Sequence, residues 1–274
     1  SDLKKLTREG IPDSFRSTVW EFLSGAADLR RQNENLYQNL LNNILEEEDK
    51  KNEEVKEEEI NTKIKKEIKN SSENNLNEEG NLQIDNIENV ASDKENLNPK
   101  ENSTNVIDNK PTSLDEIVTI KDIHRTFPKH YFFRERLGKG QRELFHVLIS
   151  YAAFNKKTGY VQGMGFLTGL FLTYFNEETS FWMLHSLMIN YELEGFFMKD
   201  FPELRKCLYV FLRLLKKFIP KIYQLLSREN VYPTMYASQW FITFFACCIP
   251  FDKLVRIYDC LFLEGFKIVY RIAL

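Results

Sequence analysis

Two short segments hold the residue types in this chain that are best suited to chemistry. Residues 120–128 read Ile-Lys-Asp-Ile-His-Arg-Thr-Phe-Pro, which places Arg125 one helical turn after Asp122. Residues 159–164 read Gly-Tyr-Val-Gln-Gly-Met and carry Gln162 next to glycine. In phosphoryl transfer, an arginine stabilises charge that develops on the transferred group, and a glutamine positions the attacking water. Together, the two segments could complete a nucleotide-hydrolysing site whose own residues are incomplete.

The arginine segment is predicted to present Arg125 away from the core. At 100° per residue, Asp122 and Arg125 lie about 60° apart, opposite the apolar side of their helix. The carboxylate could then orient the guanidinium. A solvated Asp–Arg pair of this spacing is also common on ordinary helix surfaces, where it is weak. The apolar side consists of Leu114, Ile117, Ile120, Ile123 and Phe127.

Gln162 also has a structural alternative. It could cap or hydrogen-bond near the start of the apolar helix that runs to Phe175, because Gln is common at helix N-termini. The glycines of this region are equally compatible with close helix packing. They are Gly159, Gly163, Gly165 and Gly169. Neither segment is decisive alone.

Composition divides the chain of 274 residues into three parts. Residues 42–113 contain sixteen Asn, nineteen acidic residues and ten Lys, and no aromatic residue occurs between Gln38 and Thr126. Such a stretch buries too little apolar surface to fold, so we predict a disordered insert over 42–112 that divides a domain into 1–41 and 113–274. Ile60, Ile64 and Ile68 could support a transient helix within it.

Charge follows the same division. The insert carries −9 and the whole chain −3, which leaves +6 for the remainder. A mildly basic domain suits an acidic or phosphate-bearing partner, whereas the scattered Lys and Arg argue against nucleic acid.

The remaining segments predict an all-α fold. Helices are expected over 14–23 after Pro12, from Ser113 to about Arg125, after Pro202, and over 252–263 with a stop at Gly265. Phe127 precedes Pro128 and should leave the helical region. The final residues, 271–274, read like the middle of a further helix, so we expect a fragment.

The cysteines indicate neither a metal site nor a disulfide framework. Cys207, Cys247, Cys248 and Cys260 show no metal-ligand spacing. The pair Cys247–Cys248 falls in the apolar run 236–251, which is too short and too polar at Gln239 to span a bilayer. We therefore predict a core helix with reduced, buried cysteines, in a cytoplasmic protein.

Several ordered blocks of sequence resemble the TBC family, whose helical domains activate the GTPase of Rab proteins. The segments 120–128 and 160–164 resemble the family's arginine-finger and glutamine-finger motifs. Further blocks in the right order are Arg8–Pro12 with Arg16, Trp20 and Gly25; Tyr191–Phe197 with Phe201–Leu204; and Trp240, Thr243, Pro250, Asp259 and Glu264–Gly265. The resemblance covers the chain except the insert.

The resemblance implies a GTPase activator, not an enzyme by itself, that acts in vesicle trafficking. Arg125 and Gln162 would enter the active site of a GTP-bound Rab-family GTPase in trans, while Asp122 would hold Arg125 and Tyr160 would set the Gln162 loop. The aromatic cluster of Phe127, Tyr131, Phe132 and Phe133 would form either core or an apolar contact with the GTPase switch region, and Phe127, Phe132 and Phe133 are the candidates for that contact. The domain would need no cofactor or metal of its own, because the GTPase binds GTP and Mg²⁺. Recruitment to endomembranes would occur through the partner.

The chain also departs from the family pattern. The insert is long, Gly165 replaces a more usual Asn, Tyr258 replaces a more usual Trp, and the family's C-terminal helices are expected to be missing. One alternative is a catalytically silent TBC-like scaffold that binds a GTPase or trafficking partner. An unrelated helical scaffold would leave the order of the blocks unexplained. Because silent members lack the Arg or the Gln, the sequence favours the active form.

Overall fold

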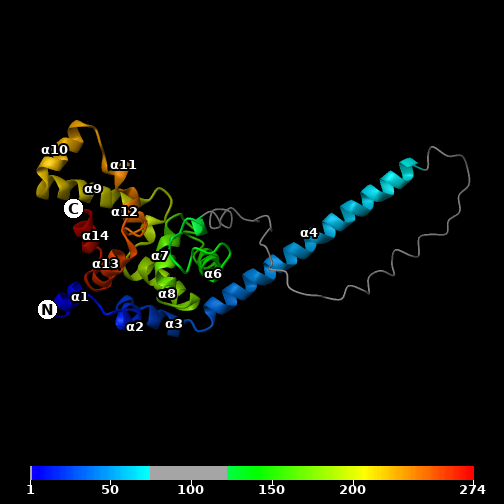
Figure 1. Cartoon of the computed structure of the whole chain (residues 1–274), viewed down its shortest axis with the longest axis horizontal. Helices are drawn as coiled ribbons and strands as arrows, with labels where there is room; N and C mark the ends of the chain where they lie inside the picture. Colours follow the sequence, from blue (N-terminus) through cyan, green and yellow to red (C-terminus); the bar gives the residue numbers. More distant parts are fainter. Residues whose placement is uncertain (1, 75–121) are drawn as a thin grey trace, which may run out of the picture. The chain divides into compact units, whose positions relative to one another are not determined.

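Every regular element in the described part of the chain, residues 2–74 and 122–274, is a helix in the computed structural model (Figure 1). The all-α prediction is confirmed. Contacts divide the chain into two units, Ser1–Ile44 with Pro111–Leu274 and Leu45–Lys110. The helices are α1 (Asp2–Glu9), α2 (Asp13–Ser24), α3 (Ala26–Gln32), α4 (Leu36–Asn74), α6 (Lys139–Phe154), α7 (Met164–Leu172), α8 (Glu177–Asn190), η2 (Glu194–Phe196), α9 (Pro202–Phe218), α10 (Pro220–Arg228), α11 (Pro233–Tyr236), α12 (Ser238–Ile242), α13 (Phe251–Glu264) and α14 (Lys267–Ala273).

The core of the first unit forms around α7, which contacts both α6 and α8. Its sequence is apolar on all sides, and every residue except Phe166 is buried. A helix of this kind requires neighbours on every side. The following helix, α8, is started by Asn176, whose side chain accepts a hydrogen bond from the Thr179 amide at 2.9 Å. This cap fixes where the chain turns back along α7.

The amphipathic helices predicted after Pro202 and over 252–263 are confirmed. Pro202 occupies the first turn of α9, and α13 ends at Gly265, whose φ of 76° suits glycine. Their buried faces contain the periodic apolar residues: Leu204, Leu208, Phe211 and Leu215 in α9, and Leu254, Ile257, Tyr258 and Leu261 in α13.

A buried polar network joins α2 to α13. The Asp259 carboxylate accepts hydrogen bonds from Arg16 Nε at 3.0 Å and from Trp20 Nε1 at 2.8 Å. The Ile11 amide donates to the same carboxylate at 3.2 Å, and Arg16 Nη2 donates to the Ile11 carbonyl at 2.6 Å. Arg16 and Trp20 are therefore structural residues that hold the N-terminal helices on α13.

The run 236–251 is not one core helix as predicted. It forms the end of α11, the short α12, and turns that lead to α13. Phe244 and Phe245 adopt positive φ angles of 48° and 66°, and both side chains are buried. The turns bury these rings but leave Cys247 and Cys248 exposed, with their Sγ atoms 2.9 Å apart. The prediction that this cysteine pair lies in the core is therefore wrong.

Residues 42–74, at the start of the predicted insert, form the rest of α4, in the region where the sequence allowed a helix around Ile60, Ile64 and Ile68. No described side chain between residues 45 and 65 is buried. This part of the chain thus forms a helix without a core of its own, in line with its polar composition. The rest of the insert, and the predicted helix start at Ser113, lie outside the described residues.

Candidate functional site

Arg125 lies in the turn that directly follows the helical residues Asp122 and Ile123, and its side chain is half-exposed. The amides of Arg125 and Thr126 donate to the Asp122 carbonyl at 3.2 and 3.1 Å, and the chain then leaves the helical region at Phe127, whose φ is 45°. The departure of Phe127 before Pro128 confirms the sequence prediction. The Arg125 guanidinium forms an ion pair with Asp122, and 49% of its side chain is exposed. The arginine can therefore reach a partner while one end is held.

Asp122 is buried, contrary to the prediction that both members of the pair face outward. Only 4% of the residue is exposed. Its Oδ2 accepts a hydrogen bond from the Tyr160 hydroxyl at 2.5 Å, which links segments 38 positions apart. Burial and this hydrogen bond raise the pKa of Tyr160 above its usual range, so the phenol stays protonated and donates. Asp122 thus links the arginine segment to the glutamine segment.

Gln162 lies on an exposed turn between Tyr160 and α7. The helix begins after Gly163 without a side-chain cap, so the capping role that the sequence left open for Gln162 is not used. Gly163 has a φ of 111°, and a Cβ at this position would lie 2.6 Å from Ile242 Cγ2. The turn is therefore anchored on one side by the Tyr160 hydroxyl and packed at Gly163 against Ile242 of α12, and Gln162 between them is exposed.

The glycines of α7 bring the arginine segment close to the helix. A Cβ at Gly165 would lie 3.1 Å from Thr126 Oγ1, and one at Gly169 would lie 2.8 Å from Thr126 Cγ2. Thr126 itself is buried and donates to the Asp122 carbonyl at 2.9 Å. Sequence reasoning missed Thr126, although the four-residue spacing of Gly165 and Gly169 marks one helix face for close approach.

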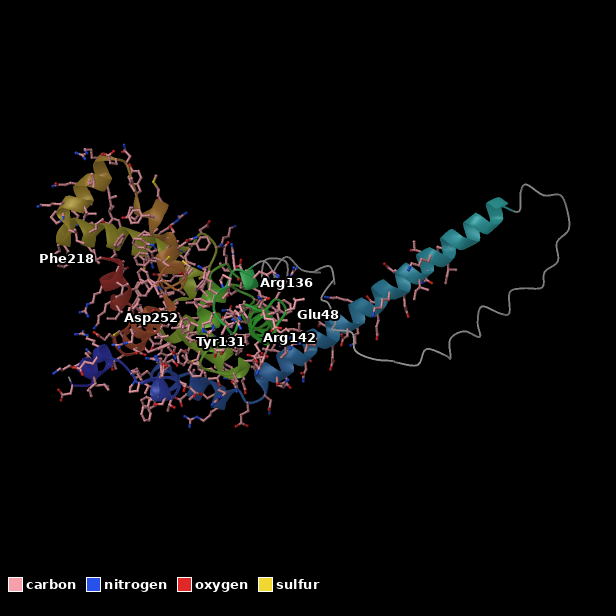
Figure 2. All side chains as sticks on the ribbon, viewed as in Figure 1. Glu48, Tyr131, Arg136, Arg142, Phe218 and Asp252 are labelled. Atoms are coloured by element: carbon pink, nitrogen blue, oxygen red, sulfur yellow. The ribbon has the colours of Figure 1, made fainter. Side chains whose placement is uncertain are left out.

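The aromatic residues after the arginine divide into core and surface. Phe133 is fully buried and offers no surface to a partner in this fold. Phe127 and Phe132 are partly exposed, and the Phe127 ring meets Phe166 edge-on at 5.7 Å between ring centroids. Tyr131, which the sequence places in the same aromatic cluster, is 73% exposed. Figure 2 labels it near Arg136 and Arg142.

The described residues contain no group of three or more His, Cys, Asp or Glu side chains placed to hold a metal ion. None of their helices is both long enough and apolar enough to cross a membrane. The candidate site consists of the exposed residues Arg125 and Gln162, whose segments are joined by the hydrogen bond between Asp122 and Tyr160.

A family model described as the Rab-GTPase-TBC domain matches residues 83–274, which is well over half of the chain. The chain belongs to this family. The match includes the segments of Arg125 and Gln162, whereas the N-terminal block around Arg16 lies outside it.

Curated relatives match 60% of the chain. The human Ecotropic viral integration site 5 protein homolog is 36% identical over 165 residues, which cover 60% of this chain and 20% of the relative. Growth hormone-regulated TBC protein 1 of Xenopus tropicalis is 37% identical over 166 residues, covering 60% of this chain and 48% of the relative. The chain thus spans less than half of either relative.

Solved structures share the fold. The crystal structure of the Chlamydomonas flagellar RabGAP TBC domain superposes with a TM-score of 0.64 at 22% identity, over 99% of this chain and 69% of that chain. The Ypt/Rab-GAP domain of Gyp1p gives a TM-score of 0.58 at 18% identity, over 98% and 75%. The likeness establishes a TBC-type helical fold.

Proposed function

We propose that this domain accelerates GTP hydrolysis by a Rab-type small GTPase in vesicle trafficking, with Arg125 and Gln162 supplied in trans. The observation that carries the proposal is that buried Asp122 links the segments of both residues. Asp122 contacts Arg125 on its own turn and Tyr160 on the Gln162 turn. The hydrogen bond between Asp122 and Tyr160 thus joins the segment of Arg125 to the segment of Gln162, and transition-state stabilisation and water positioning require one residue from each.

The roles follow from the chemistry of each side chain. The Arg125 guanidinium would stabilise charge on the γ-phosphoryl oxygens, and the Gln162 amide would orient the attacking water. Asp122 and Tyr160 are positioning residues, because both are buried and neither can touch the nucleotide without rearrangement. The GTPase would bind GTP and Mg²⁺, so this domain would act as an activator that contributes residues to another protein's active site.

The proposal is tested by phosphate release from a panel of GTP-loaded Rab proteins. Wild type should accelerate one or a few of them. Arg125→Ala should lower the stimulated turnover by about 10³–10⁵-fold, which corresponds to roughly 4–7 kcal/mol of barrier. Gln162→Ala should also abolish most of the stimulation, because the water loses its orienting group.

Matched controls are available on α9 and α10. Arg213→Ala and Gln224→Ala remove the same side-chain types from exposed positions on those helices and should leave the stimulation unchanged. If a Rab binds the wild type stably but no hydrolysis is stimulated, the domain is instead a silent scaffold. If the stimulation survives in both Arg125→Ala and Gln162→Ala, the dual-finger mechanism is wrong.

A further inference from the structure

The segment that follows Arg125 holds a second concentration of positive charge. Between Arg125 and Arg142 the sequence has one acidic residue, Glu135, and its basic side chains are exposed. In the described part of the chain, the ion pairs of this stretch join Arg125 to Asp122 and Lys139 to Glu143. Between these two pairs, Lys129, Arg134 and Arg136 form no ion pair with a carboxylate of the described residues in their own unit. We call these three cations, together with the exposed ring between them, the basic platform: Lys129, Tyr131, Arg134 and Arg136.

The platform is held in place by the buried side chain of Gln141. Its Nε2 donates to the Phe133 carbonyl at 2.8 Å, and its Oε1 accepts from the Leu137 amide at 3.0 Å. Gly140 lets the chain approach closely, since a Cβ there would lie 2.1 Å from the Phe132 carbonyl oxygen. The cations therefore project from an ordered backbone, which lowers the entropy lost when a partner binds them.

Ring contacts connect the platform to the arginine segment. The Phe127 ring, two residues after Arg125, lies 6.2 Å from the Phe133 ring between centroids. Phe133 directly precedes Arg134, whose amide donates to the His130 carbonyl at 3.0 Å. A stable interface buries about 800 Å² on each side and involves about 20–30 residues. A protein that receives Arg125 in its nucleotide pocket must therefore also face the platform.

The chemistry of the platform fits a protein partner with acidic side chains. Two of its three cations are Arg, whose planar guanidinium binds carboxylates through two parallel hydrogen bonds. Tyr131, 73% exposed, lies within the same stretch of chain. Tyr and Arg are the residue types that most often dominate binding energy at protein interfaces.

We propose that the basic platform binds an acidic surface beside the nucleotide pocket of the GTP-bound GTPase, and that this contact selects the GTPases that are accepted. The inference rests on the proposed function and names the chemistry of the partner. Complementary charge raises the association rate and disfavours partners with like charge more than it strengthens the final complex. The platform thus controls encounter, while Arg125 and Gln162 control hydrolysis.

The test removes the three cations together, as Lys129→Gln, Arg134→Gln and Arg136→Gln. We expect kcat/KM for a responsive Rab to fall by about tenfold or more at low ionic strength, with kcat nearly unchanged. The difference should shrink as salt is added, because exposed charges are screened. The control triple, Lys216→Gln, Lys217→Gln and Lys221→Gln, removes the same charge from exposed positions on α9 and α10. Figure 2 places Phe218 of α9 at the opposite end of the folded unit from Arg136.

Each other outcome contradicts the inference. Equal losses in the two triples would mean that only net charge matters, and a loss confined to kcat would mean that the platform acts on the catalytic residues. If the platform triple keeps its kcat/KM but loses binding to vesicles containing phosphatidylserine, the platform binds a membrane instead.

Failure of the proposed function is distinguishable. If wild type stimulates no Rab, the inference is tested by binding instead. The affinities of both triple variants are then measured for the same Rabs loaded with a non-hydrolysable GTP analogue. Weaker binding by the platform triple alone supports the inference, and unchanged binding overturns it.

Discussion

At the scale of single residues, the site depends on a buried carboxylate. Burying a charge is unfavourable unless it is paired and hydrogen-bonded. Asp122 meets this requirement with the Tyr160 hydroxyl on one oxygen and the Arg125 guanidinium on the other. The same two contacts that stabilise the charge also fix the positions of both segments. Stability and presentation of the catalytic groups are therefore coupled at this residue.

Tyr160→Phe tests this coupling because it removes the donated hydrogen bond and keeps the ring. A hydrogen bond to a charged group is worth about 1.5–3 kcal/mol, so the free energy of unfolding should fall by that amount in urea denaturation. Stimulated hydrolysis should also fall, because the segments of Gln162 and Arg125 lose the hydrogen bond that links them. The control is Tyr258→Phe, which removes a buried hydroxyl without a hydrogen-bond partner among the described residues and should cost little. Equal stability losses in the two variants would contradict the proposed role of Asp122.

Arg125 and Gln162 could be selected from the sequence, but their connection could not. The helical periodicity before Phe127 describes a side chain's direction relative to its own helix, so it placed Asp122 on the surface. The hydroxyl that donates a hydrogen bond to buried Asp122 comes from Tyr160, 38 positions later. A contact of this kind has no signature in either segment alone. The buried Thr126 was missed for the same reason.

At the scale of elements, α7 supports the arginine segment through its glycines. Thr126 and Phe127 lie directly over Gly165 and Gly169. The family more often has Asn at the position of Gly165, and here a side chain would press on Thr126 Oγ1 at 3.1 Å. This departure from the family pattern is therefore matched by a close approach between the arginine segment and the helix.

Gly169→Ala should displace the arginine segment, because the new Cβ would lie 2.8 Å from Thr126 Cγ2. Overpacking of this kind costs about 1–3 kcal/mol, and stimulated hydrolysis should fall with it. Thr126→Ser deletes the obstructing methyl group and keeps the hydroxyl. In the double variant, urea denaturation should reveal a favourable coupling of at least about 0.5 kcal/mol. Strictly additive effects would show that the two side chains do not meet.

The helices that could be predicted are those with a periodic pattern and a clear end. The helix after Pro202 and the helix that stops at Gly265 each have one apolar and one polar face and recognisable termini. The run 236–251 is apolar at nearly every position, so it contains no period that separates one long helix from several short ones. Phe244 and Phe245 are buried by a backbone with positive φ angles. That conformation depends on tertiary packing and not on the local sequence.

At the scale of the whole molecule, the N-terminal helices are joined to α13 by a buried charge. Asp259 is fully buried and accepts hydrogen bonds from both Arg16 and Trp20, more than two hundred positions earlier in the chain. None of the hydrogen bonds of this network involves Arg125 or Gln162. The fold and the candidate site therefore depend on separate polar networks, which mutation can separate.

Asp259→Asn should destabilise the folded unit by up to about 3–5 kcal/mol, because it removes the buried counter-charge of the Arg16 guanidinium and leaves it the exposed carboxylate of Asp13. The control on the same helix is Asp252→Asn, whose carboxylate is 68% exposed and pairs with exposed Lys253. Surface pairs contribute about 0–1 kcal/mol, so this variant should resemble wild type in urea denaturation. At a temperature where both variants remain folded, both should stimulate hydrolysis equally, since neither change alters the contacts of Asp122 with Arg125 and Tyr160. A folded Asp259→Asn variant that had lost stimulation would instead show that the N-terminal helices help to position Arg125 and Gln162.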